Sequence, residues 1–338
     1  MSGGFAPAFE RIHRLAYAYR EAKVLLSAVE LDVFSALSDQ ALDLESLRLR
    51  IGIDRRGARD FFDALVALRL LDRGDDGRYR NAPETAFYLD RTKSTYLGHE
   101  LEFINASLYP KWASLSDSLR TGRPQTEPDR SGPYGSRYRD SKGLAQFAAA
   151  MTAATRPIAD ALAGTFPWSR CKRVVDIGCA EGCLPVRLAQ SHAHLTVVGF
   201  DLPPIEPVFE AYVRKHALSD RVIFHPGDFL QAPLPAADVL VMGRVLHNWD
   251  LDTKKLLLAK TYAALSEGGR LIVYERFIDD ERMSNATGLL ASLNMLVMTP
   301  GGFDFTIADC RQWLDEAGFN GAEFAPLTPD QSMIVATK

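Results

Sequence analysis

The stretch Arg173-Val-Val-Asp-Ile-Gly-Cys-Ala-Glu-Gly182 decides the fold of this chain. It begins with two adjacent β-branched residues, Val174 and Val175, which favour a strand. A turn with two glycines follows, and residues 183–190 read as a helix. A strand, a glycine-bearing turn and a helix form the first half of a βα unit. In open α/β sheets a ligand binds outside the carboxyl ends of the strands, where this turn would lie.

The turn differs from a phosphate-binding loop. A dinucleotide fingerprint needs Gly-x-Gly-x-x-Gly so that the backbone can approach a pyrophosphate. Counted from Gly178, the second and third glycine positions hold Ala180 and Cys183. The acids Asp176 and Glu181 would repel a diphosphate, but they could hold a cation, an amine or sugar hydroxyls. The stretch is thus compatible with any tight βα turn, or with a nucleoside-type ligand such as S-adenosylmethionine, which has a sulfonium, an ammonium and a ribose but no phosphate.

The composition is that of an ordinary globular protein. A chain of 338 residues, 47% hydrophobic and 24% charged, suggests about two domains. Its net charge of −4 gives no support to a nucleic-acid partner. The four cysteines show no disulfide or metal-ligand spacing, which fits a reducing cytoplasmic location. Neither a signal peptide nor an uncharged run of about 18 residues is visible, so we expect no membrane partner.

The first hundred residues predict a mostly helical domain. Residues 9–37 carry a helical apolar stripe made of Ile12, Leu15, Ala16, Tyr19 and Ala22, which later apolar residues continue, either directly or across a break. Asp43 precedes a second helical start, residues 56–71 form a third helical segment, and Asp75-Asp76-Gly77 predicts a hairpin turn. Two helices followed by a small hairpin are typical of a winged helix.

A winged helix raises the question of DNA binding. Residues 43–80 contain nine arginines and eight acids, a net charge of nine minus eight, or +1, with the signs interspersed. A surface that reads DNA needs a basic stripe to neutralise phosphates. The charge pattern therefore favours dimerisation or the lining of a substrate pocket over DNA binding.

The middle of the chain predicts two helices around a loop. Residues 98–118 read as one helix, residues 121–143 as the main surface loop, and residues 144–164 as a second helix. Pro157 should kink or break that second helix.

From residue 173 onward, strands alternate with helices. The predicted strands are 173–178, 195–201, 222–225, 239–243, 271–275, 322–327 and 332–337. The predicted helices are 183–190, 206–216, 252–265, 285–298 and 307–317. Such alternation indicates a largely parallel sheet covered on both faces. The short link at 328–331 predicts a final hairpin, so one of the last two strands should run antiparallel to its neighbour.

Acidic residues stand at the ends of two further predicted strands. Asp201 ends the second strand and could accept two hydrogen bonds from a ribose, or could merely cap the turn before Pro203. Asp228 and Phe229 follow the third strand and could hold an adenine. The carboxylate of Asp228 could accept a hydrogen bond from the amino group of the adenine, and the ring of Phe229 could stack on the base. The alternative for this pair is a turn with a core phenylalanine.

A histidine follows the fourth strand, within Gly243-Arg244-Val-Leu-His247-Asn-Trp-Asp250. A single histidine is more often structural than catalytic, but this one is predicted at the edge that carries the acids. With an ordinary pKa of about 6.5, His247 could take a proton from a phenol. Glu275, at the end of the next strand, could accept a hydrogen bond from its other ring nitrogen, and Asp304 is a second candidate.

In this order, the motifs resemble the class I S-adenosylmethionine-dependent small-molecule O-methyltransferases, a family that includes caffeic acid, hydroxyindole and bacterial polyketide O-methyltransferases. The resemblance covers nearly the whole chain. The matching segments are 176–182, 201–203, 227–229, 246–250, Glu275, 292–296 and 300–302. It implies an α/β fold, namely a Rossmann-like class I methyltransferase sheet with an N-terminal, mostly helical, winged-helix-like dimerisation domain. The implied domains are 1–105 for dimerisation, 106–165 for linker helices at the substrate pocket, and 166–338 for the methyltransferase domain.

The resemblance also implies roles for single residues. His247 would be the general base, flanked by Glu275 and Asp304. The implied cofactor-binding residues are Asp176, Gly178, Glu181, Asp201, Leu202, Asp228, Phe229, Gly243 and Arg244. The candidate pocket residues are Phe147, Met151, Trp249, Asn294 and Met298, of which Phe147 and Met151 could equally be helix core. The implied cofactor is S-adenosyl-L-methionine, with S-adenosyl-L-homocysteine as product and no metal, in a homodimer that acts on a small molecule.

The chain departs from the family pattern at two places. Cys179 and Ala180 replace two of the three central glycines in the turn. Asp304 stands where the family has a glutamate, one methylene longer, which leaves its reach to His247 open.

Other functions remain open from the sequence. The nearest is C- or N-methylation of an aromatic or 2-oxo acid substrate. A different class is a non-catalytic winged-helix regulator that senses the adenosyl ligand. A nicotinamide dehydrogenase is disfavoured by the broken glycine pattern, and the sequence does not name the methyl acceptor.

Overall fold

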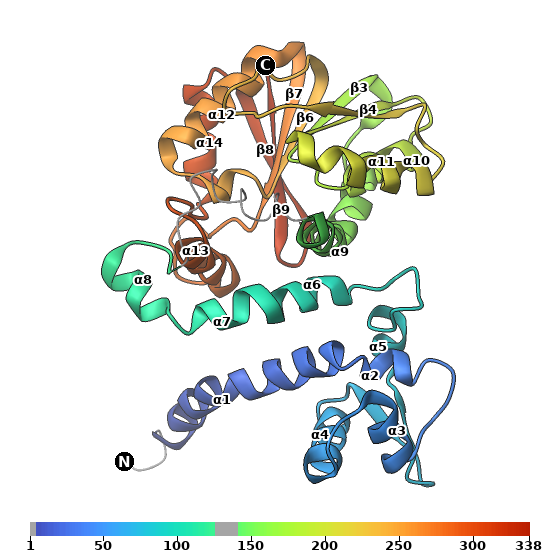
Figure 1. Cartoon of the computed structure of the whole chain (residues 1–338). Helices are drawn as coiled ribbons and strands as arrows, with labels where there is room; N and C mark the ends of the chain where they lie inside the picture. The colour runs from blue at the N-terminus through green and yellow to red at the C-terminus, as the bar shows by residue number, and fades with distance from the viewer. Residues whose placement is uncertain (1–4, 126–140) are drawn as a thin grey trace. The chain divides into compact units, whose positions relative to one another are not determined.

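The computed structural model describes residues 5–125 and 141–338, so the surface loop predicted at 121–143 lies mostly outside the described residues (Figure 1). The chain divides into two compact units, one up to Tyr109 and one from Pro110 to Lys338. The linker helices predicted at 106–165 fall almost entirely in the second unit, and the three-part division stays a prediction. Within the described residues, no helix is both long and apolar enough to cross a membrane.

The first unit is helical apart from one small hairpin. Its elements are α1 (Phe5–Glu30), α2 (Val33–Ala36), α3 (Leu44–Ile51), α4 (Arg55–Ala67), β1 (Leu71–Arg73), β2 (Tyr79–Asn81), α5 (Pro83–Tyr88), α6 (Gly98–Phe103) and the π-helical turn η1 (Ile104–Leu108). Strands β1 and β2 pair antiparallel around the predicted turn. Asp43 caps α3, because its carboxylate accepts a hydrogen bond from the N–H of Ser46. The winged-helix-like pattern is confirmed.

Two predicted helical segments of this unit are interrupted or end early. The helical segment predicted over 9–37 does contain a break, which lies at Asp32, whose φ of 57° is left-handed, so α1 and α2 are separate. The helix predicted over 56–71 ends at Ala67, and Arg69 then takes a φ of 60°. In both cases a single left-handed residue stops the helix, although neither is a glycine.

The helix predicted over 98–118 is in fact a series of shorter pieces. After α6 the backbone widens into η1, continues as α7 (Tyr109–Trp112), and restarts as α8 (Leu115–Thr121). Pro110, two residues after the last residue of the π-helical turn, has no N–H to give to an earlier carbonyl. The prediction of one continuous helix was therefore wrong.

Helix α9 (Ser141–Thr165) runs through Pro157 without the break that we expected there. The residues that follow the proline, Ile158 and Leu162, are buried in the core of the second unit. Packing of this apolar face, which includes contact with α10 (Cys183–Ser191), holds the helix together despite the lost hydrogen bond.

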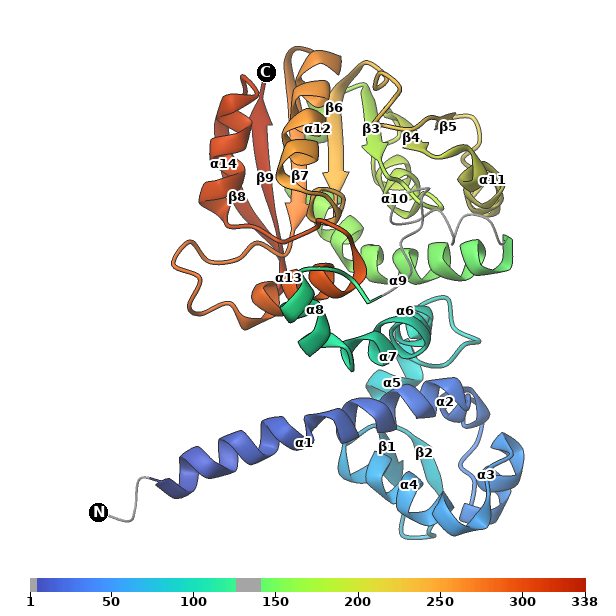
Figure 2. The same ribbon diagram turned by 60° about the vertical axis from the view of Figure 1, so that its left-hand side comes forward.

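The second unit is built on a seven-stranded sheet (Figure 2). Its strands are β3 (Arg173–Ile177), β4 (Thr196–Asp201), β5 (Val222–Pro226), β6 (Ala237–Gly243), β7 (Leu265–Glu275), β8 (Asn320–Thr328) and β9 (Gln331–Thr337). The order across the sheet is β5-β4-β3-β6-β7-β9-β8. All neighbouring pairs are parallel except that β9 runs antiparallel to β7 and β8, which confirms the predicted final hairpin.

Helices cover both faces of this sheet. They include α10, α11 (Glu206–Lys215), α12 (Leu251–Ala264) and α14 (Ile307–Glu316), whereas α13 (Ala286–Met298) packs against α8. Because side chains alternate along a strand, Val174 packs in the core under α9, α10 and α11, while Val175 packs in the core under α12 and α14. The sheet order reverses between β3 and β6, which is where ligands bind in sheets of this kind.

Candidate functional site

The turn after β3 keeps a glycine-like shape although two glycines are replaced. Gly178 has a φ of 75°, Gly182 a φ of 93°, and Ala180 between them a φ of 48°. Left-handed backbone costs a residue with a Cβ about 1–2 kcal/mol, so the turn holds Ala180 in a strained conformation. The neighbouring Cys179 is buried, and its sulfur lies against Gly199 of β4.

Asp201 is the group that holds this turn. Its carboxylate accepts hydrogen bonds from the N–H of Ala180 at 2.9 Å and from the N–H of Leu202 at 2.7 Å. It therefore ties the turn after β3 to the end of β4. Burial raises the pKa of Asp201 to about 6, against the opposing effect of these two hydrogen bonds. The sequence placed Asp201 at the strand end but gave no sign of its bond to Ala180.

Asp176 lies beside Asp201 and is also buried. Burial, and then the charge of Asp201, raise the pKa of Asp176 well above its ordinary range. Two carboxyl groups thus face the same turn, as the acids in the sequence predicted. Glu181 lies in that turn, between β3 and α10.

The residues after β5 shape their own loop. The two carboxylate oxygens of Asp228 accept hydrogen bonds from the N–H of Leu230 and from the side-chain amide of Gln231, at 2.9 and 2.8 Å. These bonds support the alternative that Asp228 stabilises a turn, and a hydrogen bond from an adenine to Asp228 stays a prediction. Phe229 packs edge-on against Trp249, with ring centres 5.7 Å apart.

Gly243 and Arg244 end β6 in a crowded place. A Cβ on Gly243 would come within 1.8 Å of the ring of Tyr274, so packing alone requires a glycine here. Arg244 has a φ of 55° and donates its backbone N–H to the carbonyl of Tyr274. Among the described residues, its buried Nε has no hydrogen-bond partner. Their contact with a cofactor remains a prediction.

The structure brings His247, Glu275 and Asp304 together. His247 lies on the short 3-10 helix η4 (Leu246–Asn248), and its Nδ1 is 3.3 Å from Oδ1 of Asp304 and 3.6 Å from Oε2 of Glu275. Its backbone N–H also donates to Oε1 of Glu275 at 3.3 Å. The shorter side chain of Asp304 therefore does reach the histidine, which the sequence left open.

The two carboxylates control the charge of the histidine. Burial alone would lower the pKa of His247, but the charges of Glu275 and Asp304 outweigh it and raise that pKa above 6.5. Burial raises the pKa of Glu275 to about 6, while the charge of His247 opposes the rise. The charges of His247 and Glu275 therefore act on one another across the cluster.

The loop after α13 delivers Asp304 to this cluster. The N–H of Asp304 donates to the hydroxyl of Ser292 at 3.2 Å, and the N–H of Gly302 donates to the hydroxyl of Thr299 at 2.8 Å. A Cβ on Gly302 would lie 2.5 Å from the carbonyl oxygen of His247, so this close approach requires a glycine. Ser292 and Gly302 lie in segments that resemble the methyltransferase family, but the sequence did not show that they position the loop that carries Asp304.

These three side chains are also possible metal ligands. Their ligand atoms lie within 4.8 Å of one another, and no other group of three or more such residues occurs in the described part of the chain. The sequence predicted that Glu275 or Asp304 would face His247, but it gave no metal-ligand spacing, because the three residues belong to different elements. Each carboxylate contacts the imidazole of His247, so the three side chains can be held together without a metal ion. That the reaction needs no metal stays a prediction.

The candidate pocket residues divide into two groups. Asn294 accepts a hydrogen bond from the indole N–H of Trp112 at 2.9 Å, and it shares α13 with Met298. Helix α13 packs against η4, which carries His247. Phe147 and Met151 lie on α9, which packs against α10 and β8, so their part in a pocket stays a prediction.

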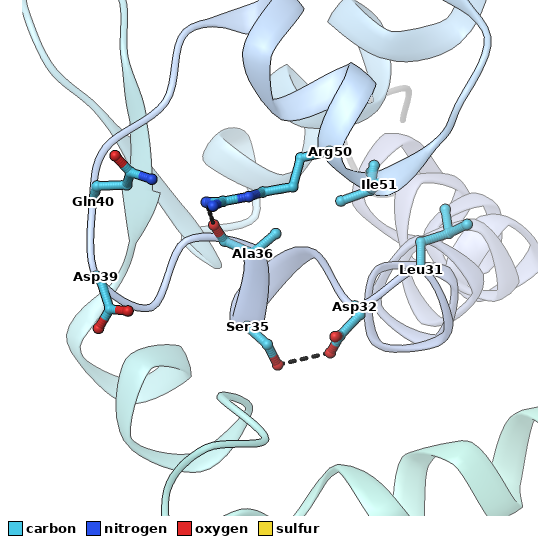
Figure 3. Close-up of a pocket in the computed structure, with 8 residues that line it drawn as sticks. All are labelled: Leu31, Asp32, Ser35, Ala36, Asp39, Gln40, Arg50 and Ile51. Atoms are coloured by element: carbon cyan, nitrogen blue, oxygen red, sulfur yellow. Dashed lines mark hydrogen bonds between the residues drawn. The ribbon is translucent and has the colours of Figure 1, made fainter.

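Two cavities stand out, and neither coincides with these groups. One, of about 300 Å³, lies in the first unit, and two of its lining groups bond within it, Arg50 to the carbonyl of Ala36 and Ser35 to Asp32 (Figure 3). The other, of about 320 Å³, lies at the start of β6 and includes Asp238 and Arg270. The second cavity is thus at the edge of the sheet opposite to His247.

Comparison with known proteins gives consistent results along the whole chain. Residues 112–320 match the family described as O-methyltransferase domain, and residues 13–91 match the O-methyltransferase dimerisation domain. The chain is 40% identical to the tetracenomycin polyketide synthesis 8-O-methyl transferase TcmO of Streptomyces glaucescens, over 97% of this chain and 96% of that protein. It is 36% identical to the N,N-dimethyltransferase OxyT of Streptomyces rimosus, over 90% and 89% of the two chains. Among solved structures it is similar to human N-acetylserotonin methyltransferase in complex with SAM, with a TM-score of 0.90, 27% identity, and coverage of 100% and 99%.

Proposed function

The chain belongs to the S-adenosylmethionine-dependent O-methyltransferase family that has a dimerisation domain, and on this premise we propose that it methylates a phenolic hydroxyl of a small aromatic, polyketide-type acceptor with His247 as the general base. The observation that carries the proposal is the buried histidine whose Nδ1 faces two carboxylates. This arrangement fixes which ring nitrogen can accept a proton.

The proposed mechanism follows from that geometry. Nδ1–H of His247 donates to Asp304, with Glu275 close by, so Nε2 is left to take the proton of the acceptor hydroxyl. The positive charge that forms on the ring is balanced by the two carboxylates. When bound, S-adenosyl-L-methionine supplies a methyl group activated by a sulfonium, so the C–S bond breaks as the O–C bond forms and S-adenosyl-L-homocysteine remains. The protein itself supplies orientation, exclusion of water and the base.

The turn after β3 fits such a cofactor. Asp201 and Asp176 offer carboxyl groups, which suit ribose hydroxyls and a cationic ligand, while a pyrophosphate would be repelled. We propose Asp201 and Leu202 for the ribose, Asp228 and Phe229 for the adenine, and Gly178 and Arg244 for the methionine end.

A labelled-methyl transfer assay against phenols, hydroxyquinones, indoles and amines tests the proposed function. The expected product of the preferred acceptor is a methyl ether that has lost its free hydroxyl, as identified by mass spectrometry. We expect the same rate after treatment with a chelator. Absence of transfer to every phenolic acceptor, with transfer to another class, would contradict the proposal.

N-methylation is a second candidate, favoured by the 36% identity to an N,N-dimethyltransferase. An amine acceptor would need the same removal of a proton and the same donor. The two candidates differ in the product, because N-methylation leaves every hydroxyl of the acceptor free.

The activity should fall at acidic pH. Only neutral His247 can accept a proton, and its pKa lies above 6.5, so kcat/KM is expected to rise with pH through that raised pKa. Glu275→Gln removes one negative charge from the cluster. We expect this variant to move the acidic limb of the kcat/KM profile to lower pH by about one unit, while the plateau rate falls because the protonated ring is less stabilised. An unmoved limb would show that Glu275 does not act on the base.

We also propose that the chain forms a homodimer through its first unit. The amino-terminal half of α1 exposes a row of apolar side chains that would be covered by a partner: Phe9 at 65%, Ile12 at 61%, Leu15 at 66% and Tyr19 at 54% exposure. This row is the stripe that the sequence predicted, and the family match at 13–91 is to a dimerisation domain.

Leu15→Lys should therefore weaken the dimer. Burial of one leucine contributes about 1.5–3 kcal/mol, and both subunits carry the substitution, so a dimer dissociation constant about 10²–10⁴-fold higher is expected, measured by analytical ultracentrifugation. Leu49→Lys is the matched control, because Leu49 is also 66% exposed but lies on α3. Equal effects of the two substitutions, or none from Leu15→Lys, would rule out α1 as the interface.

A further inference from the structure

Lys254 is a buried lysine next to the proposed base. It lies in the first turn of α12 and is 0% exposed, although lysine is almost never fully buried without a partner. Its position is three and four residues before Leu257 and Leu258, which are themselves buried, so it lies on the core face of the helix. Packing of α12 alone does not require a charged side chain on this buried face.

The ammonium group of Lys254 contacts both chain segments that carry the cluster. Its Nζ donates a hydrogen bond to the carbonyl of Trp249, two residues after His247. The same Nζ lies 3.3 Å from the ring centre of Phe303, the residue before Asp304, and 5.5 Å from that of Phe305. One side chain thus links the segment of the histidine to the segment of the aspartate.

The charges around the cluster call for a cation. Glu275 and Asp304 are 1% and 2% exposed, and the oxygens Oε2 of Glu275 and Oδ2 of Asp304 have no hydrogen-bond partner among the described residues. With both carboxylates ionised, a protonated His247 neutralises only one of them. Lys254 attracts both Glu275 and Asp304, and it attracts Asp250 at the start of its own helix.

We propose that Lys254 is a positioning residue for the methyl transfer, which holds the segments of His247 and Asp304 together and offsets the charge of the two carboxylates. The inference rests on the proposed role of His247 as base. Burial lowers the pKa of Lys254 to about 8, and the three carboxylates oppose that fall, so the group is still charged at neutral pH. Its charge makes protonation of the whole cluster less favourable, and therefore keeps His247 neutral and able to accept a proton.

Other titratable groups also face the cluster. Arg244, before η4, disfavours protonation of His247, and the buried thiol of Cys310 on α14 has a raised pKa, because of burial and then the charge of Glu275. Neither contacts the carbonyl of Trp249 or the ring of Phe303 in the way that Lys254 does. The expected effect of Lys254 on pH dependence is therefore separable from theirs.

The test is an NMR titration of histidine rings labelled with carbon-13, with the His247 signal assigned by its loss in His247→Gln. In Lys254→Met, we expect the midpoint for His247 to rise by about one pH unit. We also expect kcat at pH 7 to fall about tenfold and to recover as the pH is raised. Lys255→Met is the matched control, since the next residue of the helix forms only a surface ion pair with Glu316 at 2.7 Å.

Lys254→Gln separates charge from hydrogen bonding, because its amide can still donate to Trp249. We expect it to shift the titration as Lys254→Met does, and it serves if the methionine variant does not fold. An unchanged midpoint in both folded variants, or a full kcat at pH 7 in Lys254→Met, would overturn the inference. The ring titration needs no acceptor, so its outcome is independent of the proposed substrate class. The proposed role of His247 as base is tested separately, because an unchanged rate of methyl transfer in His247→Ala would refute it.

Discussion

His247→Ala is expected to lower kcat about 10²–10⁴-fold, the usual contribution of a positioned general base. The histidine is buried, its Nδ1 is 3.3 Å from Asp304, and its Nε2 is the nitrogen left for the acceptor. Alanine removes the base but leaves the cofactor loop untouched. The affinity for S-adenosyl-L-homocysteine, measured by calorimetry, should therefore stay within about twofold of wild type.

His216→Gln is the control for this experiment. His216 caps the end of α11, and its ring is 3.4 Å from the side-chain amide of Gln190, away from the cluster. The control should keep its full rate at neutral pH. A similar rate in His247→Ala and the wild type would refute the assignment of the base, whatever the acceptor.

Asp201→Ala is expected to weaken cofactor binding about 100-fold, which is about 2.8 kcal/mol. The substitution removes the acceptor for the N–H groups of Ala180 and Leu202, and charge-assisted bonds contribute about 1.5–3 kcal/mol each. It also removes the carboxylate proposed for the ribose. Because Ala180 is already strained, its loop should lose its shape when this bond is gone.

Asp238→Ala provides an unusually close control. Asp238 also accepts two backbone hydrogen bonds, from Lys172 and Arg173 at 2.8 and 2.9 Å, but at the start of β3. Both variants should lose some thermal stability, and only Asp201→Ala should lose affinity for S-adenosyl-L-homocysteine. An equal loss of affinity in the two variants would mean that the effect comes from general destabilisation.

The fold of the second unit was predictable because its signals are local. Most strands from Val174 onward are apolar runs bounded by a turn, so six of the seven were placed within about two residues, whereas β7 begins at Leu265, six residues before the predicted start. The helix end that was wrong, near Arg69, and the break at Asp32 that the sequence did not locate both depend on left-handed backbone, which glycine marks but these residues do not. The uninterrupted α9 depends on tertiary packing around Pro157, which no local pattern records.

The site was predictable in part for a similar reason. Parallel strands share one carboxyl edge, so Asp201, His247 and Glu275 could be expected to lie there. Asp304 lies in a loop after α13 whose path depends on two hydrogen bonds, from Asp304 N–H to the hydroxyl of Ser292 and from Gly302 N–H to the hydroxyl of Thr299. The sequence does not show which way these hydroxyls point, so it could not place Asp304. Lys254 looked like one charged residue in an ordinary helix, although its spacing from Leu257 and Leu258 already put it on the buried face.

The sheet order has a consequence for the range of acceptors. Asp201 ends β4, the cofactor turn follows β3, His247 follows β6, and Glu275 ends β7, and these four strands are consecutive neighbours. Neighbouring strands lie about 4.8 Å apart, so three strand spacings hold the ends of β4 and β7, which carry Asp201 and Glu275, at a constant separation of about 14 Å. Acceptors of different size must then be accommodated by replaceable segments such as α13. Exchange of that helix should alter which molecule is methylated while the transfer chemistry persists.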